Sequence, residues 1–470
     1  MADDFHFINL IASNGATVTI DDQLPGIDWL VLEGEYQFQS DIRLSWENSN
    51  GVSVSASGMY FVSGVSGGFI GSRLIVNGFI ENARGSDTRD FIQGNEGDNI
   101  LMGDGARTGK GGDDVLWGLD GKDTIFGGNG ADEIKGDNGD DRLFGDAGED
   151  NISGGAGVDY VEGGSGADEM YGGGDLGDTV AYRTSNAGVT ILITFGSATL
   201  GAGGHAEGDL IGGFPNIDGS DFNDTMTDTV AGTVAFGGND NIFRGFGGRD
   251  RLFLGGGNDT GFGGDDHDTI WGQAGDDKAF GGAGNDTLNM GEGNDLARGG
   301  AGNDILSGDG GNDRLFGDAG NDIIFTRLGR DRADGGAGDD QILAARGVTF
   351  AFGGSGDDKL ISAGGRNTFT GGDGVDRFEF RTQSADIETG GYTRITDFQR
   401  AKGELVDLRV LGDFNFIRSA AFSGTGLEVR FDTTANGVEV FADIDGDGIA
   451  ELKILMDGLA RVFATDFLLV

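Results

Sequence analysis

The feature that most constrains this sequence is an aspartate that recurs every nine residues. One register runs without a slip from Asp114 to Asp168, and a second runs from Asp250 to Asp376, with Thr349 and Asn367 in its two gaps. Such a period predicts an array of short stacked units rather than one globular core. The twenty aspartates are Asp114, Asp123, Asp132, Asp141, Asp150, Asp159, Asp168, Asp250, Asp259, Asp268, Asp277, Asp286, Asp295, Asp304, Asp313, Asp322, Asp331, Asp340, Asp358 and Asp376.

Each unit reads Gly-Gly-x-Gly-x-Asp-x-apolar-x, as in residues 281–289. Glycine permits a tight turn with positive φ and leaves backbone carbonyls accessible to a cation. The residues after the aspartate suffice for a short strand with one apolar side chain aimed inward. Because one such unit cannot bury its own apolar face, the units are expected to stack into a solenoid.

The repeated aspartates predict a metal with oxygen ligands. The chain contains no cysteine, which excludes disulfides and thiolate sites. Carboxylates and carbonyls in a forgiving geometry favour Ca²⁺ over Zn²⁺ and Mg²⁺.

The acidic composition narrows the class of partner. The formal net charge of −47 excludes a typical nucleic-acid partner, which needs clustered cations. An acidic disordered chain would also give this charge. However, 33 phenylalanines and regularly spaced leucine and isoleucine favour a folded protein. No apolar run approaches the roughly 20 residues that span a bilayer.

The repeats resemble those of the RTX (repeats-in-toxin) proteins. This resemblance implies a parallel β-roll with two nonapeptides per turn, so that residues 18 apart share an edge and Ca²⁺ lies between successive loops of that edge. The twenty aspartates are then the predicted calcium ligands. They form 5 same-edge pairs in the first block and 7 plus 4 in the second, which makes 16 sites. One Ca²⁺ in each would add +32 and change the charge from −47 to about −15.

One edge of the second block loses its glycines. The degenerate loops begin at Thr326, Ala344 and Ser362, 18 residues apart. These loops and their strands carry Arg327, Arg330, Arg332, Arg346 and Arg366. Two interpretations remain open: guanidinium groups replace Ca²⁺ on this edge, or the terminal repeats have simply decayed.

The fold class predicted for the whole chain is all-β, in five segments. Residues 1–84 form an N-terminal β domain, 85–182 and 219–380 two RTX β-roll blocks, 183–218 a β insertion, and 381–470 a C-terminal β domain. Within the insertion, His205 and Glu207 could ligate a metal, but a turn is favoured.

The C-terminal segment resembles the C-terminal domain of serralysin-type secreted proteins, in residues 392–398, 407–408, 443–448 and 464–470. The resemblance implies an uncleaved type I secretion signal ending in Asp466–Val470, and hence the type I secretion apparatus as a partner. It fits an acidic N-terminus without a secretory signal peptide. Residues 443–448 look like the start of an EF-hand loop. Ile454 replaces its twelfth-position glutamate, so a turn or a weak calcium site is favoured.

The protease motif of serralysins is not found here. His6, His205 and His267 do not form His-Glu-x-x-His, and Gly64–Gly68 matches a nucleophile elbow only formally. We therefore predict no catalytic residues and a secreted, calcium-binding, non-enzymatic structural protein: a surface-layer, matrix, adhesive or filament component. One alternative is a secreted hydrolase with an unrecognised site in residues 1–90 or 183–235. Another is a carbohydrate-binding or adhesion module, so self-association and cell-surface polysaccharide are both possible partners.

Aromatic residues are expected to point outward from the strands, because side chains alternate along a strand. Their rows suggest a partner surface, unless neighbouring parts of the chain cover them. The rows are Phe253, Trp271 and Phe325 on one face, and Phe262, Phe280, Phe316 and Phe352 on the other.

Overall fold

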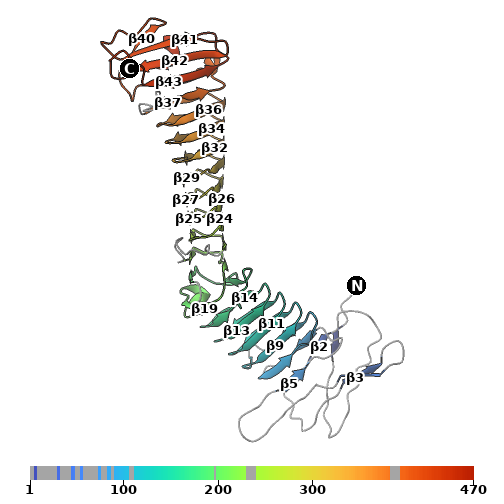
Figure 1. Cartoon of the computed structure of the whole chain (residues 1–470). Helices are drawn as coiled ribbons and strands as arrows, with labels where there is room; N and C mark the ends of the chain where they lie inside the picture. The colour runs from blue at the N-terminus through green and yellow to red at the C-terminus, as the bar shows by residue number, and fades with distance from the viewer. Residues whose placement is uncertain are drawn as a thin grey trace. The chain divides into compact units, whose positions relative to one another are not determined.

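The strands of this protein stack into a parallel β-solenoid, as predicted (Figure 1). The computed structural model describes Gly85 and residues 89–104, 111–194, 197–228, 240–381 and 392–470, plus the backbone of six short strands before residue 85. The chain forms two compact units, Met1–Thr229 and Val230–Val470.

In the first unit, consecutive strands alternate between two parallel sheets. One sheet contains β1 (Phe5–Phe7), β2 (Trp29–Val31), β6 (Asn82–Arg84), β8 (Ile100–Met102), β10 (Thr124–Asn129), β12 (Arg142–Ala147), β14 (Tyr160–Glu162), β16 (Thr179–Ala181) and β20 (Asn216–Asp218). The other contains β5 (Ser72–Ile75), β7 (Asp90–Gln93), β9 (Val115–Asp120), β11 (Glu133–Asn138), β13 (Asn151–Ala156), β15 (Glu169–Tyr171), β19 (Leu210–Gly212) and the antiparallel β18 (Thr199–Leu200).

Three shorter elements complete this unit. They are the antiparallel pair β3 (Leu44–Glu47) and β4 (Ser53–Ala56), the parallel pair β17 (Thr190–Ile193) and β21 (Thr225–Asp228), and the 3-10 helix η1 (Gly204–Ala206).

The second unit repeats the two-sheet arrangement. Its even-numbered sheet contains β22 (Ile242–Phe246), β24 (Thr260–Asp265), β26 (Lys278–Ala283), β28 (Leu296–Ala301), β30 (Arg314–Ala319), β32 (Arg330–Ala337), β34 (Val348–Ser355), β36 (Arg366–Asp373) and β38 (Thr393–Ile395). Its odd-numbered sheet contains β23 (Arg251–Phe253), β25 (Thr269–Ala274), β27 (Thr287–Glu292), β29 (Ile305–Gly310), β31 (Ile323–Phe325), β33 (Gln341–Ala344), β35 (Lys359–Ser362), β37 (Arg377–Phe380), β39 (Leu405–Asp407) and β44 (Phe467–Leu468).

The second unit ends in β40 (Asn415–Arg418), β41 (Glu428–Thr433), β42 (Gly437–Asp443) and β43 (Leu452–Asp457). The last three strands pair antiparallel, and β43 pairs in parallel with β38. The 3-10 helices η2 (Arg400–Lys402) and η3 (Ala464–Asp466) lie before β39 and β44.

The core between the two sheets is one side chain thick on each side. In the second unit the odd-numbered sheet contributes large residues such as Ile270 and Leu288, both fully buried. The even-numbered sheet contributes small ones opposite them, such as Ala279 and Ala297. This thin core fits a period that places a single apolar residue in each strand.

Parallel register sets the distance between rungs. Thr269 lies beside Thr287, which lies beside Ile305, so equivalent residues are 18 apart in the sequence. Neighbouring parallel strands are about 4.8 Å apart. Each edge of the roll therefore repeats every second nonapeptide, and any group on a loop has a copy one rung away.

Candidate metal centres

The repeat aspartates form continuous ladders along the edges of the roll. In each pair, the backbone N–H of one aspartate donates to Oδ1 of the aspartate 18 residues later; the N–O distance is 2.7 Å for Asp286 and Asp304. All 16 expected same-edge pairs are adjacent in this way. Metal ligation by these residues stays a prediction.

The second carboxylate oxygen of each repeat aspartate, Oδ2, takes no part in the ladder hydrogen bonds. The twenty aspartates are buried, at most 2% exposed. In eighteen of them Oδ2 has no hydrogen-bond partner among the described residues. A buried carboxylate oxygen without a partner is costly, so this geometry favours a cation beside it. The eighteen are Asp114, Asp123, Asp132, Asp141, Asp150, Asp159, Asp168, Asp268, Asp277, Asp286, Asp295, Asp304, Asp313, Asp322, Asp331, Asp340, Asp358 and Asp376.

Glycine keeps the space beside these oxygens open. A Cβ atom on Gly281 would overlap Oδ2 of Asp286 and lie 2.6 Å from the carbonyl oxygen of Gly299, one rung away. Only a residue without a side chain fits there. The space is thus bounded by a carboxylate and a carbonyl oxygen, which are the ligands that Ca²⁺ prefers in proteins.

Burial without a cation makes these carboxylates hard to ionise. Desolvation raises the pKa of Asp114 to about 9, of Asp150 to about 8 and of Asp132 to about 7, despite the backbone N–H that each accepts. Neighbouring aspartates in the ladder raise the pKa values of Asp114 and Asp150 further. Without a cation these carboxylates would therefore bind protons, and a divalent cation would compete with the protons.

The first unit closes its ladders with protein donors instead. Asp209 follows Asp168, whose N–H donates to Oδ1, and Oδ2 of Asp209 accepts a hydrogen bond from the Tyr182 hydroxyl at 2.9 Å. Asp178 follows Asp159, and its Oδ2 accepts from two backbone N–H groups. Neither residue belongs to the nonapeptide register, so sequence reasoning missed both.

The degenerate edge of the second unit is neutral inside. Thr349 and Asn367 stand where the ladder aspartates would be, and both are buried. The hydroxyls of Thr326 and Thr349 lie 2.9 Å apart, and the Asn367 amide donates to Ser362 Oγ at 2.9 Å. Hydroxyl and amide groups pair with one another here without a charge, although the buried Oδ1 of Asn367 has no hydrogen-bond partner among the described residues.

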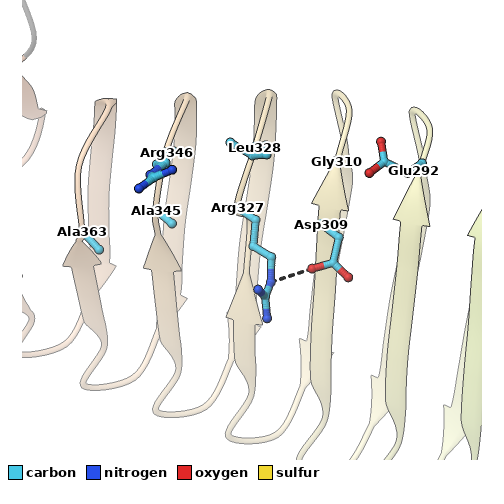
Figure 2. Close-up of a pocket in the computed structure, with 8 residues that line it drawn as sticks. All are labelled: Glu292, Asp309, Gly310, Arg327, Leu328, Ala345, Arg346 and Ala363. Atoms are coloured by element: carbon cyan, nitrogen blue, oxygen red, sulfur yellow. Dashed lines mark ion pairs between the residues drawn. The ribbon is translucent and has the colours of Figure 1, made fainter.

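The expected exchange of Ca²⁺ for guanidinium is therefore wrong for the interior of this edge. Arg330 is exposed, with its guanidinium over the Phe350 ring. Arg327 pairs at the surface with Asp309, Nε to Oδ1, at 2.6 Å (Figure 2). Arg327 and Asp309 line a shallow surface pocket, and Arg346 lines it as well. An exposed arginine can keep its hydration, whereas a buried one would need a carboxylate partner.

One further carboxylate extends the longer ladder. The register Arg377 to Leu405 places Glu404 one rung beyond Asp376. Glu404 is 2% exposed; its Oε2 accepts from the Gln399 N–H at 2.6 Å, and its Oε1 has no hydrogen-bond partner among the described residues. Burial raises its pKa to about 7. Like the repeat aspartates it is buried with one carboxylate oxygen unpartnered, but its other oxygen accepts from Gln399, five residues earlier, and not from the preceding rung. Because 28 residues separate it from Asp376, the nine-residue period could not reveal it.

We expect Glu404→Gln to lower the calcium stoichiometry of the protein by one. Gln replaces a carboxylate oxygen with an amide of similar shape, so the rung should keep its packing while losing the charge that holds the ion. Equilibrium dialysis with radioactive calcium would count bound ions. Glu207→Gln, in the exposed turn, is a matched control, since Glu207 Oε2 only accepts from the Gly203 N–H. If Glu404→Gln binds as many Ca²⁺ ions as the unchanged protein, Glu404 only stabilises the turn through its hydrogen bond from the Gln399 N–H.

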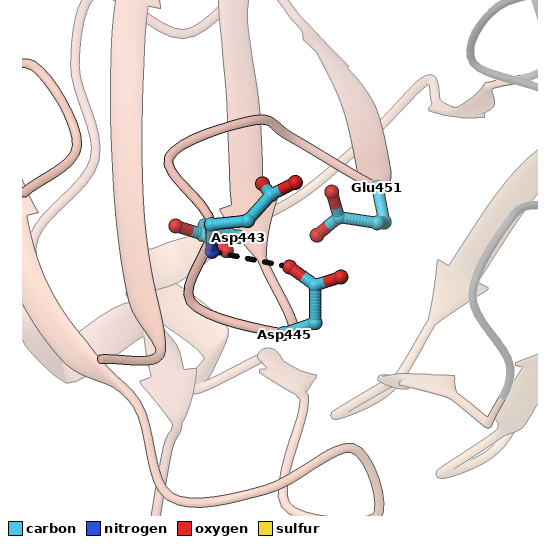
Figure 3. Close-up of side chains that lie close together, drawn as sticks. Asp443, Asp445 and Glu451 are labelled. Atoms are coloured by element: carbon cyan, nitrogen blue, oxygen red, sulfur yellow. Dashed lines mark hydrogen bonds between the residues drawn. The ribbon is translucent and has the colours of Figure 1, made fainter. Parts of the chain in front are cut away.

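The EF-hand-like stretch forms the loop between β42 and β43. Carboxylate oxygens of Asp443, Asp445, Asp447 and Glu451 lie within 4.8 Å of one another, and Figure 3 shows three of these side chains around the loop. Asp443 is buried, and its two oxygens accept from the N–H groups of Gly446 and Gly448. Hydrogen bonds of this kind stabilise a tight turn.

The other candidate residues lie in the insertion or outside the described part. Glu207 closes a turn through the Gly203 N–H, and His205 lies in η1 next to it, where its buried Nδ1 has no hydrogen-bond partner among the described residues. Gly64–Gly68 lies outside the described residues.

Two family models match this chain. The RTX calcium-binding nonapeptide repeat (4 copies) matches residues 76–106, 108–143, 144–175, 237–261, 254–288, 262–297 and 290–324. The peptidase M10 serralysin C-terminal model matches residues 309–469. The chain is an RTX repeat protein with a serralysin-type C-terminal domain. A search of curated proteins finds no match to it.

The two matches fix the general role of this RTX repeat protein. RTX repeats bind Ca²⁺, and a serralysin-type C-terminal domain belongs to proteins exported by a type I system. The matched models describe repeats and a C-terminal domain, and no protease domain is matched. Within the described residues, no helix is long and apolar enough to cross a membrane.

Proposed function

We propose that this secreted calcium-binding protein is a non-enzymatic structural component, of a surface layer, matrix, adhesive or filament, that folds on Ca²⁺ after export. The observation that carries the proposal is the row of buried Oδ2 atoms without hydrogen-bond partners along the described rungs. Most of the chain is built around them. The twenty repeat aspartates and Glu404 would hold the ions, in 16 regular sites and one terminal site.

The timing of folding follows from the affinity expected of such sites. Extracellular calcium modules bind with dissociation constants of roughly 0.1–1 mM. The chain would stay unfolded in a low-calcium cytosol and fold outside the cell. This supports export in an unfolded state. The five segments proposed from the sequence (residues 1–84, 85–182, 183–218, 219–380 and 381–470) would then fold after export.

A structural role predicts high-mass assemblies of the secreted protein that require Ca²⁺. We expect electron microscopy to show sheets or filaments in millimolar Ca²⁺ and dispersed chains in chelator, because only the folded roll presents regular surfaces. Activity assays on casein and on polysaccharides, with the same preparation, test the alternative of a secreted hydrolase. Monodisperse protein in Ca²⁺ together with turnover of either substrate would contradict the structural role.

A further inference from the structure

One face of the second unit carries arginine and phenylalanine in place of acids. Outward positions on β28, β30 and β32 hold Arg298, Arg314 and Arg332, and β34 adds Phe350 and Phe352. These strands are consecutive rungs of the even-numbered sheet (Figure 1). Arg314 and Arg332 are register partners on neighbouring rungs, about 4.8 Å apart. Arg298 lies in the next outward row, beside Phe316. We call these five residues and Arg330 and Phe316 the arginine face.

Aromatic rings fix the guanidinium groups of this face. Arg332 lies over Phe352, with 4.3 Å from its guanidinium carbon to the ring centroid, and Arg298 lies over Phe316 at 4.8 Å. Arg330 lies over Phe350 at 5.3 Å. Each contact is weak at an exposed site. Their effect is to hold the cations in position before a ligand arrives.

Part of this positive charge is not neutralised. Arg298 pairs with Asp318 and Arg332 with Asp334. Among the described residues, neither Arg314 nor Arg330 has an ion pair. Both are exposed at the rim of a shallow hollow, which is also lined by Arg332, Phe350 and Phe352 and by the ladder aspartates Asp313 and Asp331. Since both aspartates are buried, the exposed charged groups of this hollow are three arginines, on a chain with a net charge of −47.

We propose that the arginine face binds an acidic polysaccharide with a carboxylate on its sugars. A linear polymer lying along the roll axis would meet guanidinium groups on three consecutive rungs, β28, β30 and β32. Guanidinium groups bind carboxylates through two parallel hydrogen bonds, which a fixed arginine favours. The proposal rests on the secreted state of the protein, since acidic polysaccharides are the polyanions of cell exteriors.

The carboxylates of a second copy of this chain are a poorer match. The ladder aspartates are buried and face inward, so they offer no row of acids to a neighbour. The exposed row one residue before them is mixed: it contains Asn294, Asn312 and Arg330 on one edge, and Asn321, Asp339 and Asp357 on the other. A neighbouring roll would therefore present in this row of the second unit only a pair of acids at the rung spacing, whereas a polyuronate carries a carboxylate on every sugar.

The test is binding of a short fluorescent oligogalacturonate, too short to gel, to the full-length protein in millimolar Ca²⁺. We expect binding that weakens with added salt, because exposed charges are screened. The double variant Arg314→Gln and Arg330→Gln should weaken binding on the order of tenfold or more, since two charge-assisted contacts are lost. Arg142→Gln is the matched control, because Arg142 lies over Tyr160 in the same kind of contact in the first unit.

Several outcomes would overturn the proposal. They are equal binding by the double variant, equal binding of neutral dextran oligomers, and tighter binding of poly-glutamate, which would point to a protein partner. Circular dichroism in Ca²⁺ checks that the variants fold, and the single variant Arg314→Gln replaces the double variant if the latter does not. Failure of binding with intact calcium-dependent assembly would reject this site while leaving the structural role in place.

Discussion

Excess chelator at about pH 7.5 should abolish most of the strand signal of this protein, and millimolar Ca²⁺ should restore it. The expected change is large because the ladders run through both units. Without Ca²⁺, each rung brings carboxylates together in a space that water does not reach. Like charges at these distances repel strongly in a medium of low dielectric constant.

The refolding is expected to be cooperative in calcium concentration. Each ion would lie between two rungs, so filling one site orders the loop that forms the next. Far-ultraviolet circular dichroism during a calcium titration measures this, with a midpoint of roughly 0.1–1 mM. Mg²⁺ at equal concentration is the control, because its strict octahedral geometry suits these loops poorly. Equal strand content in chelator and in Ca²⁺ would refute the calcium dependence.

Acidification should replace calcium in part. The pKa values of the ladder aspartates in the folded, metal-free chain are raised from 3.8 to about 6 for Asp141, about 7 for Asp132 and about 9 for Asp114. A raised folded-state pKa means that the folded chain binds protons more tightly than the unfolded chain. The resulting stabilisation is complete below about pH 4 and is lost as the pH rises through about 6 to 9.

In chelator, lowering the pH from about 7.5 to about 5 should therefore recover much of the strand signal. The pH has to stay above the isoelectric point, which is about 4.1. A parallel titration in millimolar Ca²⁺ should show little change over this range, since the carboxylates are already neutralised. If the chelated protein is equally unstructured at both pH values, the carboxylates are not the groups that prevent folding.

The geometry of the ladders was predictable from the nine-residue period together with the resemblance to RTX proteins, which implies two nonapeptides per turn. This arrangement places Asp286 beside Asp304, and the structure has them hydrogen-bonded. The outward aromatic rows were predictable from alternation along a strand; Phe253 and Trp271 stack with their ring centroids 4.3 Å apart. In both cases residues 18 apart in the sequence are neighbours in the structure.

The ends of the ladders could not be predicted in this way. Tyr182 reaches Asp209, which lies within the insertion 27 residues later, and Glu404 joins Asp376 only through the pairing of β37 with β39. The neutral edge has the same origin, because Thr326 and Thr349 meet through the fold rather than through a shared motif. Where the repeat stops, tertiary register decides which side chains meet.

The last strand, β44, bears on the order in which the parts of this protein fold. Phe467 and Leu468 pair with Val406 and Asp407 in the odd-numbered sheet, and both carboxylate oxygens of Asp466 bind the Arg400 guanidinium at 2.6 Å. Asp466 and Phe467, which belong to the predicted secretion signal, are thus buried in the folded unit, while Val470 stays exposed. If the export apparatus binds this segment as an extended chain, the pairing of β44 has to follow export. Each rung that folds outside the cell would then prevent the exported chain from moving back, and β44 would bury part of the signal last.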